Sequence, residues 1–219
     1  MNLKSALREL LDRGDLGAIA EMAVRHKRVL AVLLSLTFDP EAQIGWRAVE
    51  AMGPAAAGIA GRDPQCVRSH LRRLHWLLSE ESGGVCWRAP EAMAEIVRQR
   101  PDLFADYVPI IIHLILNLAH EDLDHFRAGI LWAVGRLGTL AGDHFRAVRG
   151  AIAAALDGTD PQVRGMAVWC LGQIGQARLL AARSDLLADR RPVDLYEDGQ
   201  LQRTTVRDLV RRALGEGSA

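Results

Sequence analysis

Residues 156–175 read Leu156-Asp157-Gly158-Thr159-Asp160-Pro161-Gln162-Val163-Arg164-Gly165-Met166-Ala167-Val168-Trp169-Cys170-Leu171-Gly172-Gln173-Ile174-Gly175. Asp160 supplies a side-chain acceptor just before Pro161, a pair typical of a helix start because proline loses no hydrogen bond at the first helical position. Gly175 is placed where such a helix should end. The apolar residues between them follow the spacing of one buried helix face, namely Val163, Ala167, Cys170, Leu171 and Ile174. The stretch therefore predicts one amphipathic helix.

The same pattern recurs along the chain. In five places an apolar or aromatic residue is followed directly by arginine: Trp46-Arg47, Trp87-Arg88, Phe126-Arg127, Val163-Arg164 and Val206-Arg207. The arginines are 41, 39, 37 and 43 residues apart. A helical pattern repeated at a period of about 40 residues is typical of a helical solenoid.

The repeats are degenerate. One further segment has the full apolar stripe, formed by Phe126, Ile130, Ala133, Val134 and Leu137. In the two earlier segments, Glu50, Glu91 and Glu95 fall on the equivalent stripe, so those helices must be rotated or the alignment shifts there.

We therefore predict an all-α fold, an α-solenoid of about five degenerate helix pairs over residues 27–219, preceded by capping helices within residues 1–26. The predicted capping helices span residues 3–11 and 15–25, and the first helices of the pairs span residues 27–37, 64–79, 104–120, 142–156 and 176–188. The second helices carry the repeat arginines and span residues 40–52, 85–99, 124–139, 160–175 and 205–214. Gly53 should end a second helix, and Pro109 should kink or delay a first helix.

One segment breaks the helical period. Residues 193–206 alternate in character around Asp198-Gly199, and Asp-Gly between alternating apolar residues is a strong signal for a β-hairpin. We predict a small hairpin inserted before the last helix, with Thr204 or Thr205 capping that helix. Its expected role is to cover the C-terminal end of the core, and the alternative is a projection that binds a partner.

Composition favours a soluble protein without general affinity for polyanions. The 27 basic and 27 acidic residues balance, which disfavours nucleic acid as a partner. Cys66, Cys86 and Cys170 lack a paired spacing and are typical of a reducing compartment. The longest apolar run, from Val108 to Leu118, is too short to span a bilayer. We expect a cytoplasmic protein without a membrane segment.

Residues 156–175 resemble a HEAT repeat, most closely the HEAT-like repeat named after phycobilisome bilin lyases. The resemblance covers residues 27–215 as a repeat pattern and is motif-specific in the third and fourth pairs. It implies an α-solenoid that most often serves as a protein-binding scaffold. It also implies that the arginine of the second helix pairs with an acidic residue in the preceding turn. Asp157 or Asp160 would then serve Arg164, and Glu121 or Asp122 would serve Arg127.

Enzymes built from such repeats provide the competing hypotheses. Deoxyhypusine hydroxylases place His-Glu pairs early in their second helices to bind iron, and the matching positions here are Ala128-Gly129 and Gly165-Met166. Alkylpurine DNA glycosylases of HEAT-like fold combine tryptophans, a carboxylate and basic residues in a cleft, and this activity is the alternative that we keep. Possible metal ligands gather around one turn without a recognisable spacing: His113, His120, Glu121, Asp122, Asp124 and His125. We expect no metal, no cofactor and no catalytic residue.

The candidate binding residues are Arg127, Trp132, Arg164 and Trp169. Each tryptophan follows a repeat arginine by five residues, which turns it away from the core stripe of its own helix. Small residues lie near the rings on that face: Ala128, Gly135 and Gly172. A large aromatic on a smooth surface is typical of a binding hot spot, so we predict a non-enzymatic scaffold that binds a protein or peptide on the face of the second helices. The competing interpretation is that the rings pack against the neighbouring repeat.

Overall fold

The structure is a computed structural model and describes residues 2–78, 88–117 and 126–216. These residues are mainly α-helical, with one two-stranded antiparallel sheet. They fall into two compact units. Unit 1 contains Met1–Ala105 together with Tyr196–Leu201, and unit 2 contains Asp106–Leu195 and Gln202–Ala219.

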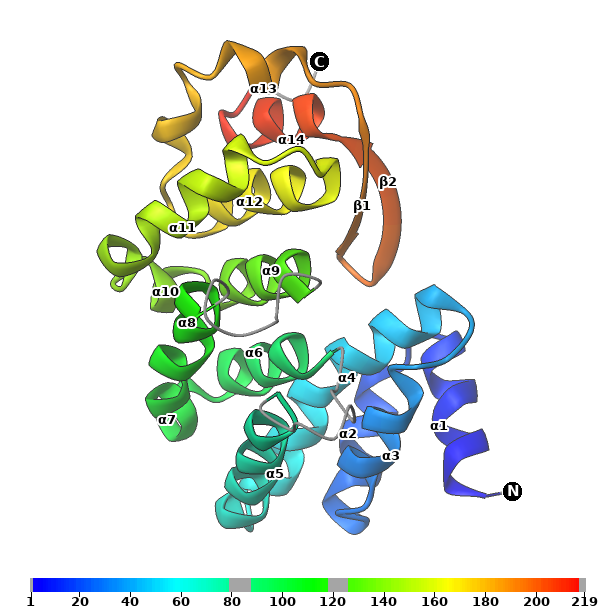
Figure 1. The fold of residues 1–219 in the computed structure, drawn as a ribbon. Helices are drawn as coiled ribbons and strands as arrows, with labels where there is room; N and C mark the ends of the chain where they lie inside the picture. Colours follow the sequence, from blue (N-terminus) through cyan, green and yellow to red (C-terminus); the bar gives the residue numbers. More distant parts are fainter. Residues whose placement is uncertain (1, 79–87, 118–125, 217–219) are drawn as a thin grey trace. The chain divides into compact units, whose positions relative to one another are not determined.

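In unit 1 the long helix α4 packs against α2 and α6, with α3 and α5 also in contact with it (Figure 1). Helices α2 and α6 thus lie on either side of α4. The elements are α1 (Leu3–Asp12), α2 (Leu16–Arg25), α3 (Val29–Leu36), α4 (Ala42–Ala60), α5 (Pro64–Trp76), α6 (Ala89–Gln99) and α7 (Pro101–Phe104).

In unit 2 the central helix is α12, which packs against α9, α14 and α11. The helices are α8 (Val108–Leu116), α9 (Arg127–Leu137), α10 (Thr139–Gly142), α11 (Phe145–Asp157), α12 (Pro161–Gln173), α13 (Ser184–Ala188) and α14 (Val206–Ala213). Short 3₁₀ turns occupy Ala105–Tyr107 and Ala177–Leu180. The predicted first helix over residues 176–188 is thus divided into a 3₁₀ turn and α13. The chain re-enters a helix at Ser184-Asp185, whose short polar side chains favour helix starts.

Several helix boundaries follow the predicted chemistry. The Asp63 carboxylate accepts from Cys66 N at 3.0 Å, and that of Asp160 accepts from Gln162 N at 2.8 Å. Gly138 and Gly175 follow the second helices α9 and α12 with φ of 57° and 73°. Pro109 lies in the first turn of α8, so the helix is delayed to Val108, where proline is tolerated.

The prediction that Gly53 ends a helix is wrong, because α4 continues through Gly53 and Pro54 to Ala60. Met52, Ala55 and Ile59 are buried along this second half, so burial outweighs the local breaker signal. Gly53 allows α4 and α6 to approach closely, because a Cβ there would lie 2.9 Å from the carbonyl oxygen of Glu95 on α6.

The predicted core stripes are largely present. All five residues of the α9 stripe, Phe126 to Leu137, are buried. On α12 Ala167, Cys170, Leu171 and Ile174 are buried, whereas Val163 is only half-buried at the exposed start of the helix. The glutamates on the equivalent stripe of α6 do not require a rotated helix, because Glu91 and Glu95 are themselves buried.

The hairpin prediction is confirmed. Strands β1 (Pro192–Glu197) and β2 (Gln200–Thr205) form a long ribbon that turns at Asp198-Gly199 (Figure 1). Both turn residues have positive φ, 50° and 74°, as a tight hairpin turn requires. Thr205 then caps α14 by accepting from Asp208 N at 3.2 Å.

Replacement of Gly199 by valine should lower the free energy of unfolding by about 1–2 kcal/mol, because a β-branched residue is strained at positive φ. Urea unfolding followed by circular dichroism measures the effect. Asp198→Asn is the matched control and should change stability by less than about 0.5 kcal/mol, since asparagine tolerates this conformation. A valine variant as stable as the control would contradict the turn geometry.

Candidate binding site

The two predicted tryptophans are not on an exposed surface. Trp132 on α9 and Trp169 on α12 are 1% and 5% exposed. Their rings stack with centroids 6.2 Å apart and planes inclined by 8°. The Arg136 guanidinium lies 5.3 Å from the centroid of the Trp132 ring. The expectation of exposed aromatic rings is therefore wrong, and packing between neighbouring repeats, the competing interpretation, describes these side chains.

The small residues near the rings accommodate the neighbouring elements of the same unit. A Cβ on Gly135 would lie 2.4 Å from Cζ3 of Trp169. One on Gly172 would lie 3.2 Å from Cβ of Ala213 on α14, and one on Gly165 would lie 2.5 Å from Cγ2 of Val193 on β1. The space that the sequence assigned to a partner is thus filled by the chain itself.

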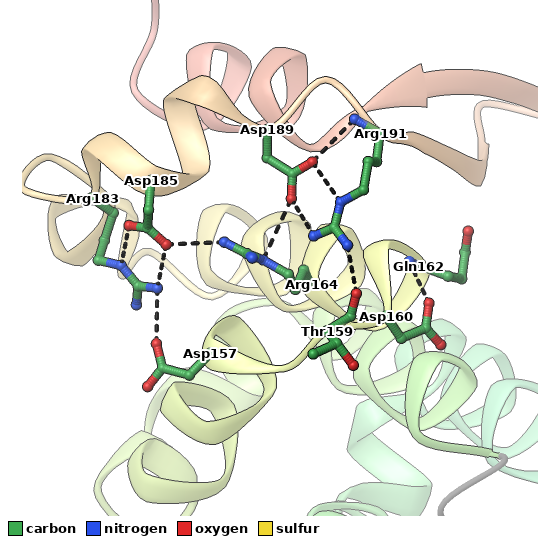
Figure 2. Close-up of polar contacts among 9 residues, drawn as sticks. All are labelled: Asp157, Thr159, Asp160, Gln162, Arg164, Arg183, Asp185, Asp189 and Arg191. Atoms are coloured by element: carbon green, nitrogen blue, oxygen red, sulfur yellow. Dashed lines mark hydrogen bonds and ion pairs between the residues drawn. The ribbon is translucent and has the colours of Figure 1, made fainter.

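Arg164 is engaged inside unit 2 by acidic residues from the segment after α12 (Figure 2). Its Nη2 donates to Asp185 at 2.9 Å, and its Nε lies 3.6 Å from an oxygen of Asp189. The predicted partners serve elsewhere, since Asp157 binds Arg183 at 2.9 Å and Asp160 caps α12. The arginine of this repeat therefore joins α12 to α13, and its side chain is only 14% exposed.

The same cluster fixes the path of the chain into the hairpin. Arg183 donates to Asp185 at 2.8 Å, and Arg191 donates to Asp189 at 2.6 Å and to the carbonyl oxygen of Thr159 at 2.6 Å. Figure 2 shows these side chains converging from α12, α13 and the loops around them. The arrangement links the turn before α12 to the residues on either side of α13, which indicates a stabilising role.

We expect this cluster to weaken in acid. The hydrogen bond from Arg183 lowers the pKa of Asp185 from 3.8 to about 2, against the opposing effect of burial. A lowered pKa means that the folded state favours the carboxylate. Its contribution is therefore present above pH 3.8 and is lost as the pH falls towards about 2.

Lowering the pH from about 5 to about 2.5 should therefore decrease the midpoint of urea unfolding more in the wild type than in Asp185→Asn. Asp143→Asn, which changes an exposed aspartate outside the cluster, is the control and should keep the wild-type dependence. Equal pH dependence in wild type and Asp185→Asn would show that Asp185 does not contribute.

Arg127 begins α9 and is half-buried. Its predicted partners, Glu121 and Asp122, lie outside the described residues, as do most members of the possible metal cluster: His120, Glu121, Asp122, Asp124 and His125. Its remaining member, His113, has Nδ1 3.0 Å from the carbonyl oxygen of Pro109. Within the described ranges no three His, Cys, Asp or Glu side chains are grouped to hold a metal ion.

Sequence reasoning missed a cluster in unit 1, where the tip of the hairpin meets α4. Gln43, Trp46, Arg47 and Glu50 follow an i, i+3, i+4, i+7 spacing and share one face of α4. The side-chain amide of Gln43 donates to the carbonyl oxygen of Gly199 at 2.7 Å and accepts from Leu201 N at 2.7 Å. This amide holds the hairpin backbone as a neighbouring strand would.

Two further residues of this face contact the tip. The Trp46 ring stacks on Tyr196 with centroids 5.4 Å apart and planes inclined by 5°. The Tyr196 hydroxyl donates to Glu50 at 2.5 Å. Burial and this hydrogen bond raise the pKa of Tyr196, so the hydroxyl stays protonated as a donor. Tyr196 is 1% exposed and is the anchor of the tip.

Arg47 and Arg88, two of the repeat arginines, complete the cluster. Arg47 donates to the carbonyl oxygens of Gly199 at 3.2 Å and of Leu11 at 3.0 Å, at the end of α1. The Arg88 guanidinium lies 3.9 Å from the centroid of the Trp46 ring and binds Glu91 at 3.3 Å. Repeat arginines in both units therefore tie neighbouring elements together.

The glutamates that interrupt the predicted stripe are structural members of this region. Glu91 and Glu95 are 1% and 0% exposed, and Glu95 accepts from Arg98 at 2.8 Å. Burial raises the pKa of Glu91, and the nearby Arg88 opposes that shift. Arginines three residues before Glu91 and three residues after Glu95 are the sequence signal that could have identified these buried ion pairs.

Unit 2 repeats the amide contact at the other end of the hairpin. The Gln162 side chain donates to the carbonyl oxygen of Asp194 at 2.7 Å and accepts from Asp194 N at 2.9 Å. Gln43 and Gln162 both lie in the first turns of second helices. Two second helices thus bind the backbone of the hairpin through the same chemical group.

No family model matches the chain. An uncharacterized protein of Archaeoglobus fulgidus is 25% identical over 183 residues, which cover 81% of this chain and 91% of that protein. The crystal structure of the archaeal HEAT-like repeats protein from Thermococcus onnurineus NA1 is similar with 16% identity and a TM-score of 0.36, over 98% of this chain and 99% of that one. Among the described helices, none is long and apolar enough to cross a membrane.

Proposed function

We propose that the chain is a non-enzymatic α-solenoid of HEAT-like helix pairs, of the type named after phycobilisome bilin lyases, that binds a protein or peptide along its second helices. The observation that carries this proposal is the pair of glutamine amides, Gln43 and Gln162, that each hold the backbone of the hairpin. Backbone recognition of this kind gives affinity for polypeptide, and neighbouring side chains supply specificity.

In unit 2 the proposed surface follows the N-terminal turns of the second helices α9 and α12. Residues 130–135 of α9 and 165–171 of α12 are buried, whereas Arg127 to Gly129 and Pro161 to Arg164 are half-buried. The first turn of a helix also presents backbone N–H groups and the positive end of the helix dipole. We therefore propose Arg127 as a contact residue of this surface. Arg164, whose side chain is 14% exposed and bound to Asp185, supports the surface together with Trp132 and Trp169.

We also place the protein in the cytoplasm, a proposal supported by the free thiols of Cys66 and Cys170.

A second candidate function is the alkylpurine DNA glycosylase activity, favoured by one observation. Unit 1 brings Trp46 close to Tyr196 and to Arg88, which binds the buried Glu91, so tryptophan, carboxylate and arginine occur together. Two observations oppose it: both Tyr196 and Arg88 already contact the Trp46 ring, and the chain has no net positive charge. We expect no release of alkylated purines from duplex DNA and only weak, salt-sensitive binding. Submicromolar binding to duplex DNA together with release of alkylated purines would show that the glycosylase function is the right one.

A displayed peptide library selected against the immobilised protein tests the scaffold. Selected peptides should bind the wild type and lose about tenfold or more in affinity to Arg127→Glu, measured by fluorescence anisotropy. An acidic residue is favourable in a first helical turn, so this variant should fold. Arg149→Glu on the exposed side of α11 is the matched charge reversal on a first helix and should bind normally. If both variants lose affinity equally, or if neither loses affinity, the second helices are not the binding surface.

A further inference from the structure

We propose that the N-terminal face of α4, formed by Gln43, Trp46, Arg47 and Glu50, is a recognition site for a tyrosine-bearing β-turn of a partner protein. In the isolated chain its own hairpin tip, Tyr196–Leu201, occupies this site. The inference deepens the proposed function, on which it rests, by naming the partner chemistry and the group that regulates access.

The α4 face contains three kinds of recognition group. The Gln43 amide binds one carbonyl and one N–H of the backbone, at Gly199 and Leu201. Trp46 provides a flat ring for an aromatic side chain, and Glu50 accepts the hydrogen bond of a phenolic hydroxyl. A segment that fits must therefore present tyrosine, a free carbonyl three residues later and a free N–H five residues later.

The contacts of the tip resemble those of a bound peptide. Tyr196 is its one fully buried side chain, while Asp198 and Gln200 are exposed. The remaining attachment consists of hydrogen bonds to backbone atoms, including the bond from Arg47 to Gly199. One aromatic anchor with hydrogen bonds to backbone atoms is a common pattern by which peptides bind to protein surfaces. The other end of β1 has a similar amide contact, from Gln162 to the Asp194 backbone, and in addition the apolar packing of Val193 against Gly165.

Occupation by the chain's own tip regulates access. A covalently attached segment competes at an effective concentration in the millimolar range, so a free peptide of equal affinity cannot displace it at micromolar concentration. A partner must bind more tightly than the tip, or the tip must first be released. Loss of the tip from the site should therefore increase binding of a matching peptide.

The test uses a fluorescein-labelled peptide with the sequence of residues 192–205 and the full-length chain. In Tyr196→Ser the attached tip loses its anchor, while the α4 face is unchanged. This variant should bind the peptide at least about tenfold more tightly than the wild type, measured by fluorescence anisotropy. Leu201→Pro removes the N–H that donates to Gln43 and releases the tip by a second route, so it should show the same gain.

Matched controls assign the binding to α4. Adding Gln43→Ala to Tyr196→Ser should remove the gain, and so should replacement of the peptide's tyrosine by serine. Adding Arg149→Glu, which changes α11, should leave the gain intact. Circular dichroism confirms folding of each variant. If both tip variants fold and neither binds the peptide more tightly than the wild type, or if the gain survives Gln43→Ala, the proposal is wrong. Because the library test relies on Arg127 of α9, peptides that depend on Arg127 would still support the general scaffold in that case.

Discussion

Truncation of Trp132 to alanine should lower the free energy of unfolding by about 3–5 kcal/mol, and truncation of Trp169 should have a similar effect. Both rings are almost fully buried, and each removal leaves a large cavity between α9 and α12. Neighbouring backbone cannot fill such a space without distortion. Urea or thermal unfolding followed by circular dichroism measures the loss, which corresponds to roughly 2–4 °C per kcal/mol for a chain of this length.

Trp76→Ala is the matched control. Trp76 lies at the end of α5 and is 56% exposed, so its truncation should cost well under about 1 kcal/mol. In the double variant Trp132→Ala with Trp169→Ala, the loss should be smaller than the sum of the single losses by about 0.5–1.5 kcal/mol, the coupling of a stacked aromatic pair. Single variants as stable as Trp76→Ala would mean that the rings are not packed. A stable double variant with lost partner binding would return them to the binding surface.

The tryptophans also show what a sequence period can and cannot predict. The spacing from Arg164 to Trp169 predicts a ring turned away from the stripe that includes Leu171. It carries no information about which other helix covers that side. Residues 165–171 of α12 are buried without interruption, because α9, α11 and α14 surround the helix. A helix that is buried all round has no exposed face for periodicity to reveal.

Local signals were more successful than long-range ones. The Asp198-Gly199 turn and the caps at Asp160 and Thr205 depend on a few adjacent residues, and the structure contains these three. The local signal at Gly53 failed, because burial along the second half of α4 outweighs it. The partners of Arg164 depend instead on the path of the chain over the following 25 residues, since Asp185 and Asp189 reach it from α13 and the residue after that helix. No period in the sequence encodes that path.

The candidate site on α4 was beyond the reach of sequence reasoning for the same reason. Gln43 and Leu201 are separated by 158 positions in the chain. Gln43, Arg47 and Glu50 share a helix face whose composition is typical of a solvent-exposed surface. The interrupted apolar stripe at Glu50, Glu91 and Glu95 was the only indication of unusual chemistry in this part of the chain, and the structure buries two of these carboxylates.

Gly135→Ala should destabilise the protein by about 1–3 kcal/mol, although alanine is the better helix former by up to about 1 kcal/mol. The added Cβ would lie 2.4 Å from Cζ3 and 2.8 Å from Cε3 of Trp169, and 3.2 Å from the backbone Cα of Cys170. Trp169 is itself stacked on Trp132, so the ring cannot move aside without disturbing a second buried side chain. Overpacking therefore outweighs the gain in helix propensity.

Gly150→Ala on α11 isolates the propensity term. A Cβ at Gly150 meets no heavy atom within 4 Å, so this variant should gain about 0.5–1 kcal/mol in stability. The two glycine-to-alanine changes are thus expected to shift the urea midpoint in opposite directions at unchanged m-value. Gly135→Ala should also be measured in the variant Trp169→Leu, because removal of the Trp169 ring removes the clash with the added Cβ. In that background Gly135→Ala should cost nothing or become stabilising, and a penalty that persists would place the obstacle in the backbone at Cys170 instead of the ring.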